Sequence, residues 1–153
     1  MAQMPDPIRS FLELKTLAVV GASRRQTQPG CLVYRKLKQA GYQVFPVNPA
    51  AEQIDGDPCF TDLASLPDRP EGVVITTPPQ VTPKIIDDCI AQGIRHVWIH
   101  RSIGQGSLEA ESVARGRSAG LNIIDAGCPM MYVDPVDTPH RIMRFLLRLF
   151  GRS

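Results

Sequence analysis

Strand-length apolar runs alternate with helical patterns along the chain, and this alternation limits the possible folds more than any other feature of the sequence. The first run, 16–20, is almost entirely apolar and ends at Gly21, which is typical of a strand covered on both faces. Similar runs occupy 42–47, 72–76, 95–99 and 121–124. Between them, apolar residues have the spacing of helices roughly 10 to 13 residues long. This order predicts βαβ units and a parallel sheet.

The expected fold class is therefore α/β: a single Rossmann-like domain over 1–153, with a doubly wound parallel sheet of about five strands and flanking helices. A chain of 153 residues can bury one such core and is too short for a separate catalytic domain beside it. Asp6 is expected to cap a first helix that has Pro7 at its first position. Helices are expected over 6–12, from Gly30 to Gly41, from Val81 to Gly93, over 108–119 and over 138–150, with a short helix or turn inside 58–67.

Composition and charge exclude several classes of protein. The formal net charge of +2 does not indicate a broad nucleic-acid-binding face. No run approaches the roughly 20 apolar residues that cross a bilayer, and the N-terminus lacks a signal peptide, so we expect a cytoplasmic protein without a membrane partner. The cysteines form no CxxC pair, which predicts reduced thiols and no zinc site at Cys31, Cys59, Cys89 and Cys128.

The residues that follow the strands are the candidates for ligand binding, because a doubly wound sheet has its ligand crevice outside the carboxyl ends of the strands. Gly21, Ala22, Ser23, Arg24 and Arg25 follow the first strand. A tight turn at Gly21, the Ser23 hydroxyl and two guanidinium groups can hold a pyrophosphate. The GxGxxG and GxxxxGK[ST] patterns are absent, which argues against a P-loop ATPase. The alternative is a surface loop with solvated arginines.

Val47, Asn48 and Pro49 follow the second strand, where NAD-binding domains usually place an acidic residue on the ribose hydroxyls. The missing carboxylate weakens an NAD interpretation and leaves room for a ribose that carries a phosphate, as in coenzyme A (CoA) or NADP. The alternative is that the Asn-Pro pair only starts a turn.

Thr77, Pro78 and Pro79 follow the third strand. They offer a hydroxyl and two residues without an amide hydrogen, which form a rigid apolar wall for adenine or a pantetheine arm. The prolines can equally serve only to end the strand. Ile99 and His100 end the fourth strand, and His100 is a hydrogen-bonding candidate rather than a catalyst, since no carboxylate is paired with it in the sequence.

Cys128 and Pro129 follow the fifth strand. Cys128 fits either a reactive thiol or a buried small hydrophobe, and the buried interpretation is preferred. A catalytic dyad of Cys128 with His140, or a metal shared with His96 or His100, would require a convergence that sequence spacing does not show. We therefore expect no catalytic residue and no metal-binding residue in this chain.

The C-terminal segment 138–150 has two stripes at helical spacing. The apolar stripe consists of Ile142, Phe145, Leu146 and Leu149, and the basic stripe of Arg141, Arg144 and Arg148. We expect the apolar stripe to pack on the sheet and the basic stripe to form a subunit interface of a homo-oligomer. Binding to a membrane surface is the least favoured use of this helix.

Several segments together resemble a known family, the small bacterial CoA-binding proteins related to the CoA-binding domain of the succinyl-CoA synthetase α subunit. The resemblance covers nearly the whole chain and is found in 18–23 (AVVGAS), 41–49 (GYQVFPVNP), 77–79 (TPP), 93–98 (GIRHVW) and 127–130 (GCPM). It implies that 21–23 contacts phosphates and that 47–49 and 77–79 line the nucleotide. It also implies that Ile99 and the Cys128-Pro129 pair approach the pantetheine arm.

The resemblance implies CoA or an acyl-CoA as the ligand of a stand-alone carrier, sensor or accessory subunit. The synthetase's phosphohistidine belongs to a following domain, so ligase activity is not expected here. Two alternatives stay open. One is an NAD(P)-dependent oxidoreductase, for which we identify no hydride-transfer partner, and the other is an interaction module that uses the C-terminal helix.

Overall fold

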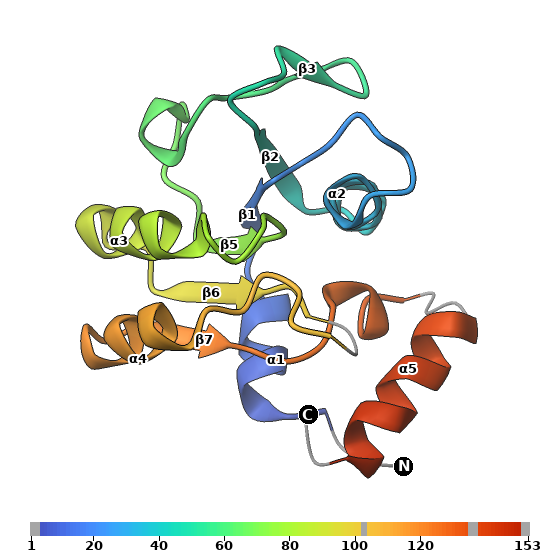
Figure 1. Cartoon of the computed structure of the whole chain (residues 1–153). Coiled ribbons are helices and arrows are strands. Elements are labelled where there is room, and N and C mark those ends of the chain that lie inside the picture. Colours follow the sequence, from blue (N-terminus) through green and yellow to red (C-terminus); the bar gives the residue numbers. More distant parts are fainter. Residues whose placement is uncertain (1–3, 102–103, 135–137, 151–153) are drawn as a thin grey trace.

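A five-stranded parallel sheet forms the centre of the computed structural model, which describes residues 4–101, 104–134 and 138–150 (Figure 1). The strands lie in the order β2-β1-β5-β6-β7. Their bounds are β1 Thr16–Val20, β2 Gln43–Val47, β5 Gly72–Ile75, β6 His96–Ile99 and β7 Asn122–Ile124. The predicted α/β class, the parallel sheet and its five strands are confirmed.

Helices cover both faces of this sheet. They are α1 Asp6–Leu12, α2 Pro29–Gln39, α3 Thr82–Gln92, α4 Ala110–Ser118 and α5 Thr138–Leu149, with short 3-10 turns η1 Leu63–Ser65 and η2 Pro129–Met131. Leu17 and Val19 of β1 face the layer of α1, α2 and α5, whereas Ala18 and Val20 face α3 and α4. Successive strand residues point to opposite faces, which explains why the runs are apolar without alternation. Trp98 is fully buried against Phe11, with ring centroids 5.4 Å apart.

Three helix ends differ in how well the sequence predicted them. Helix α1 has Pro5 at the N-cap position and Asp6 inside the helix without a capping hydrogen bond, so the predicted Asp6 cap is wrong. The glycine ends are confirmed: Gly93 caps α3 with φ 71°, and Gly41, with φ 97°, follows the C-cap of α2. Left-handed backbone at these positions is the conformation that glycine adopts without steric cost.

A small hairpin, β3 Gln53–Ile54 and β4 Asp57–Pro58, lies outside the central sheet and was not predicted. Its turn residues Asp55 and Gly56 both have left-handed backbone, with φ 51° and 81°. An Asp-Gly pair is a strong signal for such a two-residue turn, so the sequence did contain the evidence. Ile54 is fully buried in the layer that contains α2 and fixes the hairpin to the domain.

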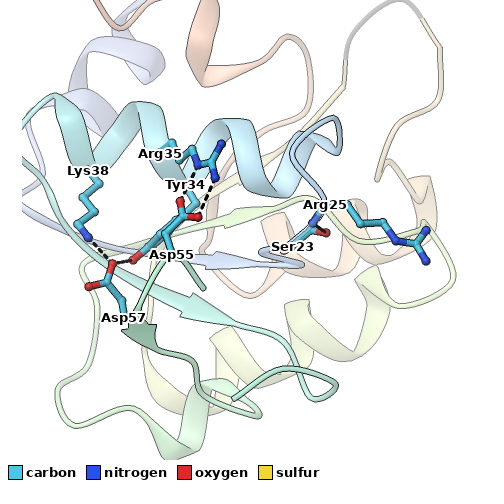
Figure 2. A network of polar contacts seen from close by, with 7 residues as sticks. All are labelled: Ser23, Arg25, Tyr34, Arg35, Lys38, Asp55 and Asp57. Atoms are coloured by element: carbon cyan, nitrogen blue, oxygen red, sulfur yellow. Dashed lines mark hydrogen bonds and ion pairs between the residues drawn. The ribbon is translucent and has the colours of Figure 1, made fainter. Parts of the chain in front are cut away.

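Charged and phenolic side chains of α2 hold this hairpin through hydrogen bonds and ion pairs (Figure 2). Arg35 donates two hydrogen bonds to the Asp55 carboxylate, Nε to Oδ2 at 2.6 Å and Nη2 to Oδ1 at 2.8 Å. Asp57 accepts a hydrogen bond of 2.5 Å from the Tyr34 hydroxyl and forms an ion pair with Lys38. These contacts attach the hairpin to α2. The hairpin lies midway along the segment between β2 and η1, so this segment is held at its centre.

Replacing Asp57 with asparagine should lower the free energy of unfolding by about 1 kcal/mol at pH 7, because the side chains of Asp57 and Lys38 are 35% and 49% exposed and solvent screens their ion pair. The Lys38 and Tyr34 hydrogen bonds hold the pKa of the Asp57 carboxyl below its ordinary value. Its stabilising effect is therefore complete above about pH 4 and is lost as the pH falls through the lower pKa of the folded state. Urea unfolding of both proteins between pH 7 and pH 3 checks this, and a difference that grows on acidification would contradict it.

Helix α5 faces the domain with the opposite side from the one predicted. Ile142, Phe145 and Leu149 are 54%, 65% and 67% exposed, so most of the apolar stripe does not pack on the sheet. Instead, Leu147 is buried and the Arg144 guanidinium lies over the ring of Tyr132, 5.6 Å from its centroid. Arginine stems and planar guanidinium groups pack well on aromatic rings, so one member of the basic stripe packs on the domain where the apolar stripe was expected to do so.

Candidate functional site

The strand order changes direction at β1, which has β2 on one side and β5 on the other. The chain leaves β1 toward β2 and later returns to the other side, and this topological switch leaves a crevice at the carboxyl ends of the strands. A cleft of about 650 Å³ lies there. Eight of the predicted site residues line it: Gly21, Ser23, Arg25, Val47, Asn48, Pro49, Thr77 and Pro78.

Hydrogen bonds between neighbouring strand ends shape the floor of the cleft. The Gly21 amide donates to the Val47 carbonyl at 2.9 Å, and the amide and hydroxyl of Thr76 both donate to the Val20 carbonyl at 2.9 Å. Gly21 has φ 94°, and a Cβ atom there would lie 2.6 Å from the Thr76 hydroxyl oxygen. The tight turn predicted at Gly21 therefore needs glycine for its backbone conformation and for space.

Gly30 in the first turn of α2 lets the helix approach the Gly21 turn closely. A Cβ atom on Gly30 would lie 1.9 Å from the Gly21 carbonyl oxygen. This is the packing function that the last glycine of a GxGxxG motif performs in dinucleotide-binding domains. The motif is absent from the sequence, yet the Gly21 and Gly30 pair brings the helix start equally close to the loop. The sequence did contain a sign of this close packing. Glycine lowers the helix propensity at the start of α2, so its presence there indicates another role.

Asn48 joins the loops that follow β1 and β2. Its side-chain amide donates to the Ala22 carbonyl at 2.8 Å, and its Oδ1 accepts a hydrogen bond of 2.8 Å from the Ala50 amide. Asn48 therefore starts a turn, as one of the two interpretations predicted. One amide hydrogen of the side chain is not used by these two bonds, and a contact with ribose stays a prediction.

Hydrogen bonds from Ser107 and Thr82 fix the wall of the cleft that Thr77 and Pro78 form. Ser107 donates a hydrogen bond of 2.5 Å to the Thr77 carbonyl, and its own carbonyl accepts one of 2.6 Å from the buried Thr82 hydroxyl. The Thr77 hydroxyl oxygen is buried and has no hydrogen-bond partner within the described part of the chain. A buried polar group of this kind costs free energy unless a ligand or water satisfies it.

Charge is unevenly distributed around the cleft. Lys84 and Asp88 form an ion pair of 2.7 Å on one wall, and Asp62 accepts the Ser65 amide at the start of η1. Arg25 has no ion-pair partner among the residues that the structure describes, while the Ser23 hydroxyl accepts a hydrogen bond of 3.0 Å from the Arg25 amide (Figure 2). The loop at 21–28 is thus the part of the cleft with uncompensated positive charge, which suits a phosphate group.

The remaining predicted residues do not line this cleft. Ala22 is buried beneath the loop, Arg24 is exposed beside it and Pro79 is partly exposed one residue beyond the Pro78 lining position. Ile99 and Cys128 are buried, with exposed fractions of 0% and 2%. Pro129 is also buried at the start of η2.

His100 lies at the end of β6 and is partly buried. Burial and the neighbouring His140 lower the pKa of His100 to about 4, so the ring is neutral at physiological pH. His96 begins the same strand and therefore lies at the opposite edge of the sheet, roughly 13 Å away along the strand. A metal shared by these two histidines is thus excluded by the strand geometry. In the described ranges, no group of three or more metal-binding side chains could hold an ion.

The wall that η1 and α3 contribute to the cleft was not predicted from the sequence. Its residues are Thr61, Asp62, Leu63, Val81, Lys84, Ile85 and Asp88, and Gln28 adds to the opposite side. None of them follows a strand directly, so the rule about strand ends does not select them. The Asp62-to-Ser65 spacing, a capping box at the start of η1, was the available signal for this turn.

Thiol titration should show that Cys128 is not a reactive nucleophile. Cys31, Cys89 and Cys128 are buried and Cys59 is partly buried; burial raises the pKa of Cys89 to about 12. We expect at most one thiol per folded chain to react rapidly with Ellman's reagent at pH 8, and all four after unfolding in urea. Loss of the rapid reaction on replacing Cys128 with serine, rather than Cys59, would contradict this expectation.

A family comparison identifies the class of ligand. The model of the CoA binding domain matches residues 15–134. The chain belongs to this CoA-binding domain family. CoA, as the sequence predicted, is the ligand class of the family. The cleft fits a phosphorylated nucleotide: it has a suitable volume and a close glycine turn, and it contains a guanidinium group and a buried hydroxyl that find no partner among the described residues. The expected small-molecule ligand is thereby supported.

The curated relatives of this CoA-binding domain are larger enzymes. The ADP-forming acetate–CoA ligase II of Archaeoglobus fulgidus is 33% identical over 94 residues, which are 60% of this chain and 14% of the ligase. The ADP-forming acetate–CoA ligase of Methanocaldococcus jannaschii is 25% identical over 118 residues, 74% of this chain and 17% of that enzyme. The chain therefore spans less than a fifth of the length of these relatives.

Solved structures support the same fold. A hypothetical protein from Pyrococcus horikoshii OT3 has a TM-score of 0.75 and 28% identity, over 85% of this chain and 94% of its own. A protein from Thermus thermophilus has a TM-score of 0.72 and 27% identity, over 82% and 93%. The dinucleotide-forming acetyl-coenzyme A synthetase 1 of Ca. Korarchaeum cryptofilum has a TM-score of 0.65 and 30% identity, over 82% of this chain and 28% of the synthetase. Among the helices described here, none has the length and apolar character to cross a membrane.

Proposed function

We propose that this chain binds CoA or an acyl-CoA in the cleft at the ends of β1, β2 and β5, as a carrier, sensor or accessory subunit. One observation carries the proposal. Loops that are far apart in the sequence meet in one cleft of about 650 Å³, where Arg25 and the Thr77 hydroxyl lie beside the close turn at Gly21. Among the described residues, the Arg25 guanidinium has no ion-pair partner and the Thr77 hydroxyl has no hydrogen-bond partner. Recognition of phosphate and of a polar nucleotide edge needs groups of this kind.

In this proposal, the pyrophosphate lies on the loop that contains Ser23 and Arg25, close to the start of α2. The adenosine part lies between Pro49 and Pro78, which stand on opposite sides of the cleft floor as rigid apolar surfaces. The pantetheine arm runs along the carboxyl ends of β5 and β6 toward His100 and the Cys128-Pro129 turn.

A binding role on its own, without ligase activity, is supported by two structural neighbours. The neighbours from P. horikoshii and T. thermophilus share more than nine-tenths of their length with this chain, so proteins built mainly of this unit exist. The relatives named as acetate–CoA ligases make acetyl-CoA the first acyl form to test. A neutral His100 with a pKa of about 4 suits a hydrogen-bonding contact better than general-base catalysis at pH 7.

Isothermal titration with CoA, acetyl-CoA, NAD and NADP tests the proposed ligand class. We expect CoA or acetyl-CoA to bind at least about tenfold more tightly than either nicotinamide dinucleotide, because Asn48 replaces the carboxylate that NAD-binding domains offer to the ribose. Mass spectrometry of ligand released from the denatured purified protein identifies the form bound in cells. Preferential binding of NAD or NADP would refute the proposal.

A further inference from the structure

Helix α5 presents a stripe of exposed apolar side chains that CoA binding does not use. Ile142, Phe145 and Leu149 are 54%, 65% and 67% exposed, and Phe150 after the helix is 71% exposed. The helix lies at the edge of the molecule beside η2 (Figure 1). The family match ends at residue 134, so this helix lies beyond the part of the chain that it shares with the CoA-binding domain model.

The opposite side of α5 is anchored, so the stripe is held in an outward orientation. Leu147 is only 4% exposed. The Arg144 guanidinium lies over the Tyr132 ring and donates a hydrogen bond of 2.8 Å to the Met131 carbonyl. Large exposed apolar patches with polar rims mark interaction surfaces.

The spacing of the stripe is that of a coiled-coil seam. Ile142, Phe145 and Leu149 are separated by three and then four positions, as the a and d positions of a heptad are. In the same heptad, Leu147 and Arg144 fall on the far side, in agreement with their packing against the domain. A groove of about 590 Å³ borders Ile142 and Phe145 on the side of the helix that carries the arginines, and its lining consists of Arg141, Ile142, Arg144, Phe145 and Arg148.

The charges around the groove determine which occupant fits it. Arg141 and Arg148 are seven positions apart and occupy the same flanking heptad position, and the sequence of α5 contains no acidic residue. In an antiparallel pair of two copies, these arginines face each other across the seam. In a parallel pair they face Leu146, which offers no opposite charge. Flanking charges select coiled-coil partners, so a second copy is disfavoured and an acidic partner is favoured.

We propose that this face of α5 binds an amphipathic helix of another protein, whose apolar stripe is flanked by Asp or Glu. The apolar stripe of that helix covers Ile142, Phe145 and Leu149, and its carboxylates pair with Arg141 and Arg148. This site is separate from the nucleotide cleft and does not depend on which ligand the cleft holds. It gives a CoA-binding unit a way to attach to a protein that uses the coenzyme.

Fluorescence anisotropy with a labelled synthetic helix of three heptads, Leu at a and d and Glu at e and g, tests the proposal on the full chain. A matched peptide has Lys in place of Glu. We expect the Glu peptide to bind at least about tenfold more tightly than the Lys peptide, and its binding to disappear in Phe145→Glu. Leu32→Glu, at another exposed apolar position, is the matched control and should bind normally. The Arg141→Glu, Arg148→Glu double variant should prefer the Lys peptide.

Three outcomes would overturn the proposal. The first is equal binding of both peptides, or Glu-peptide binding that survives Phe145→Glu. The second is dimerisation of the unliganded chain in sedimentation velocity, abolished by Phe145→Glu, which would assign the face to a second copy. The third is Phe145-dependent sedimentation with phosphatidylglycerol vesicles without binding of the Glu peptide, which would assign it to a membrane surface. CoA titration of each variant shows that the domain is folded and tests the cleft separately.

Discussion

Replacing Gly30 with alanine should abolish CoA binding and lower the free energy of unfolding by about 2 to 3 kcal/mol. The added Cβ atom would lie 1.9 Å from the Gly21 carbonyl oxygen and 2.9 Å from the Thr76 hydroxyl oxygen. Both contacts involve the strand-end loops that form the cleft floor, so the start of α2 must move away from them. Titration calorimetry with CoA and urea unfolding measure the two effects.

Gly104→Ala is the matched control, because a Cβ atom at Gly104 meets no other atom within 4 Å. This variant should retain the affinity for CoA and the stability of the unchanged protein. If Gly30→Ala bound CoA normally, the close approach of α2 to the Gly21 turn would not be part of the binding site.

Replacing Arg24 and Arg25 together with alanine should weaken CoA binding by about 10- to 100-fold and leave the thermal midpoint nearly unchanged. Both side chains are exposed on the loop after β1, and neither has an ion-pair partner within the described residues. Their loss therefore removes charge-assisted contacts to phosphate without breaking a contact inside the domain. The remaining affinity should also depend less on salt than that of the unchanged protein, because fewer ionic contacts remain to be screened.

Arg95→Ala is the control for this experiment. Arg95 is exposed and precedes β6, so it lies at the edge of the sheet opposite the cleft. Its removal changes the net charge without changing the proposed phosphate site. An equal loss of affinity in Arg95→Ala would mean that the effect comes from the overall charge of the protein and not from the loop.

The central sheet could be predicted because burial on both faces leaves a strong signal in the sequence. Residues 17–20 are apolar without alternation, and the structure directs them in turn toward the two helical layers. Hairpin 53–58 was not predicted because its strands have two residues each, which is too short for a periodic pattern. Only its Asp55-Gly56 turn gave a signal.

For helix α5, the sequence predicted the element but not its orientation on the domain. Periodicity predicted its two stripes, but it could not decide which stripe faces the domain. The side that packs was decided by the position of Tyr132, which accepts the Arg144 guanidinium on its ring. Such a contact depends on tertiary structure that the local sequence does not contain.

The candidate site was predictable where it follows the strands. Gly21, Asn48 and Thr77 are brought together because parallel strands end at one edge of the sheet. The wall from α3 and η1 was missed, since Lys84 and Asp62 do not directly follow a strand of the central sheet. Gly30 was expected only as a helix start, and its close packing on Gly21 becomes visible in three dimensions.

Titration of the isotopically labelled protein with CoA, followed by assigned amide NMR spectra, tests most directly whether the three loops hold the coenzyme. We expect the largest chemical-shift changes at Gly21, Ser23, Asn48 and Thr77, with little change along α5. Unchanged signals from these four residues, together with saturable changes elsewhere, would contradict it.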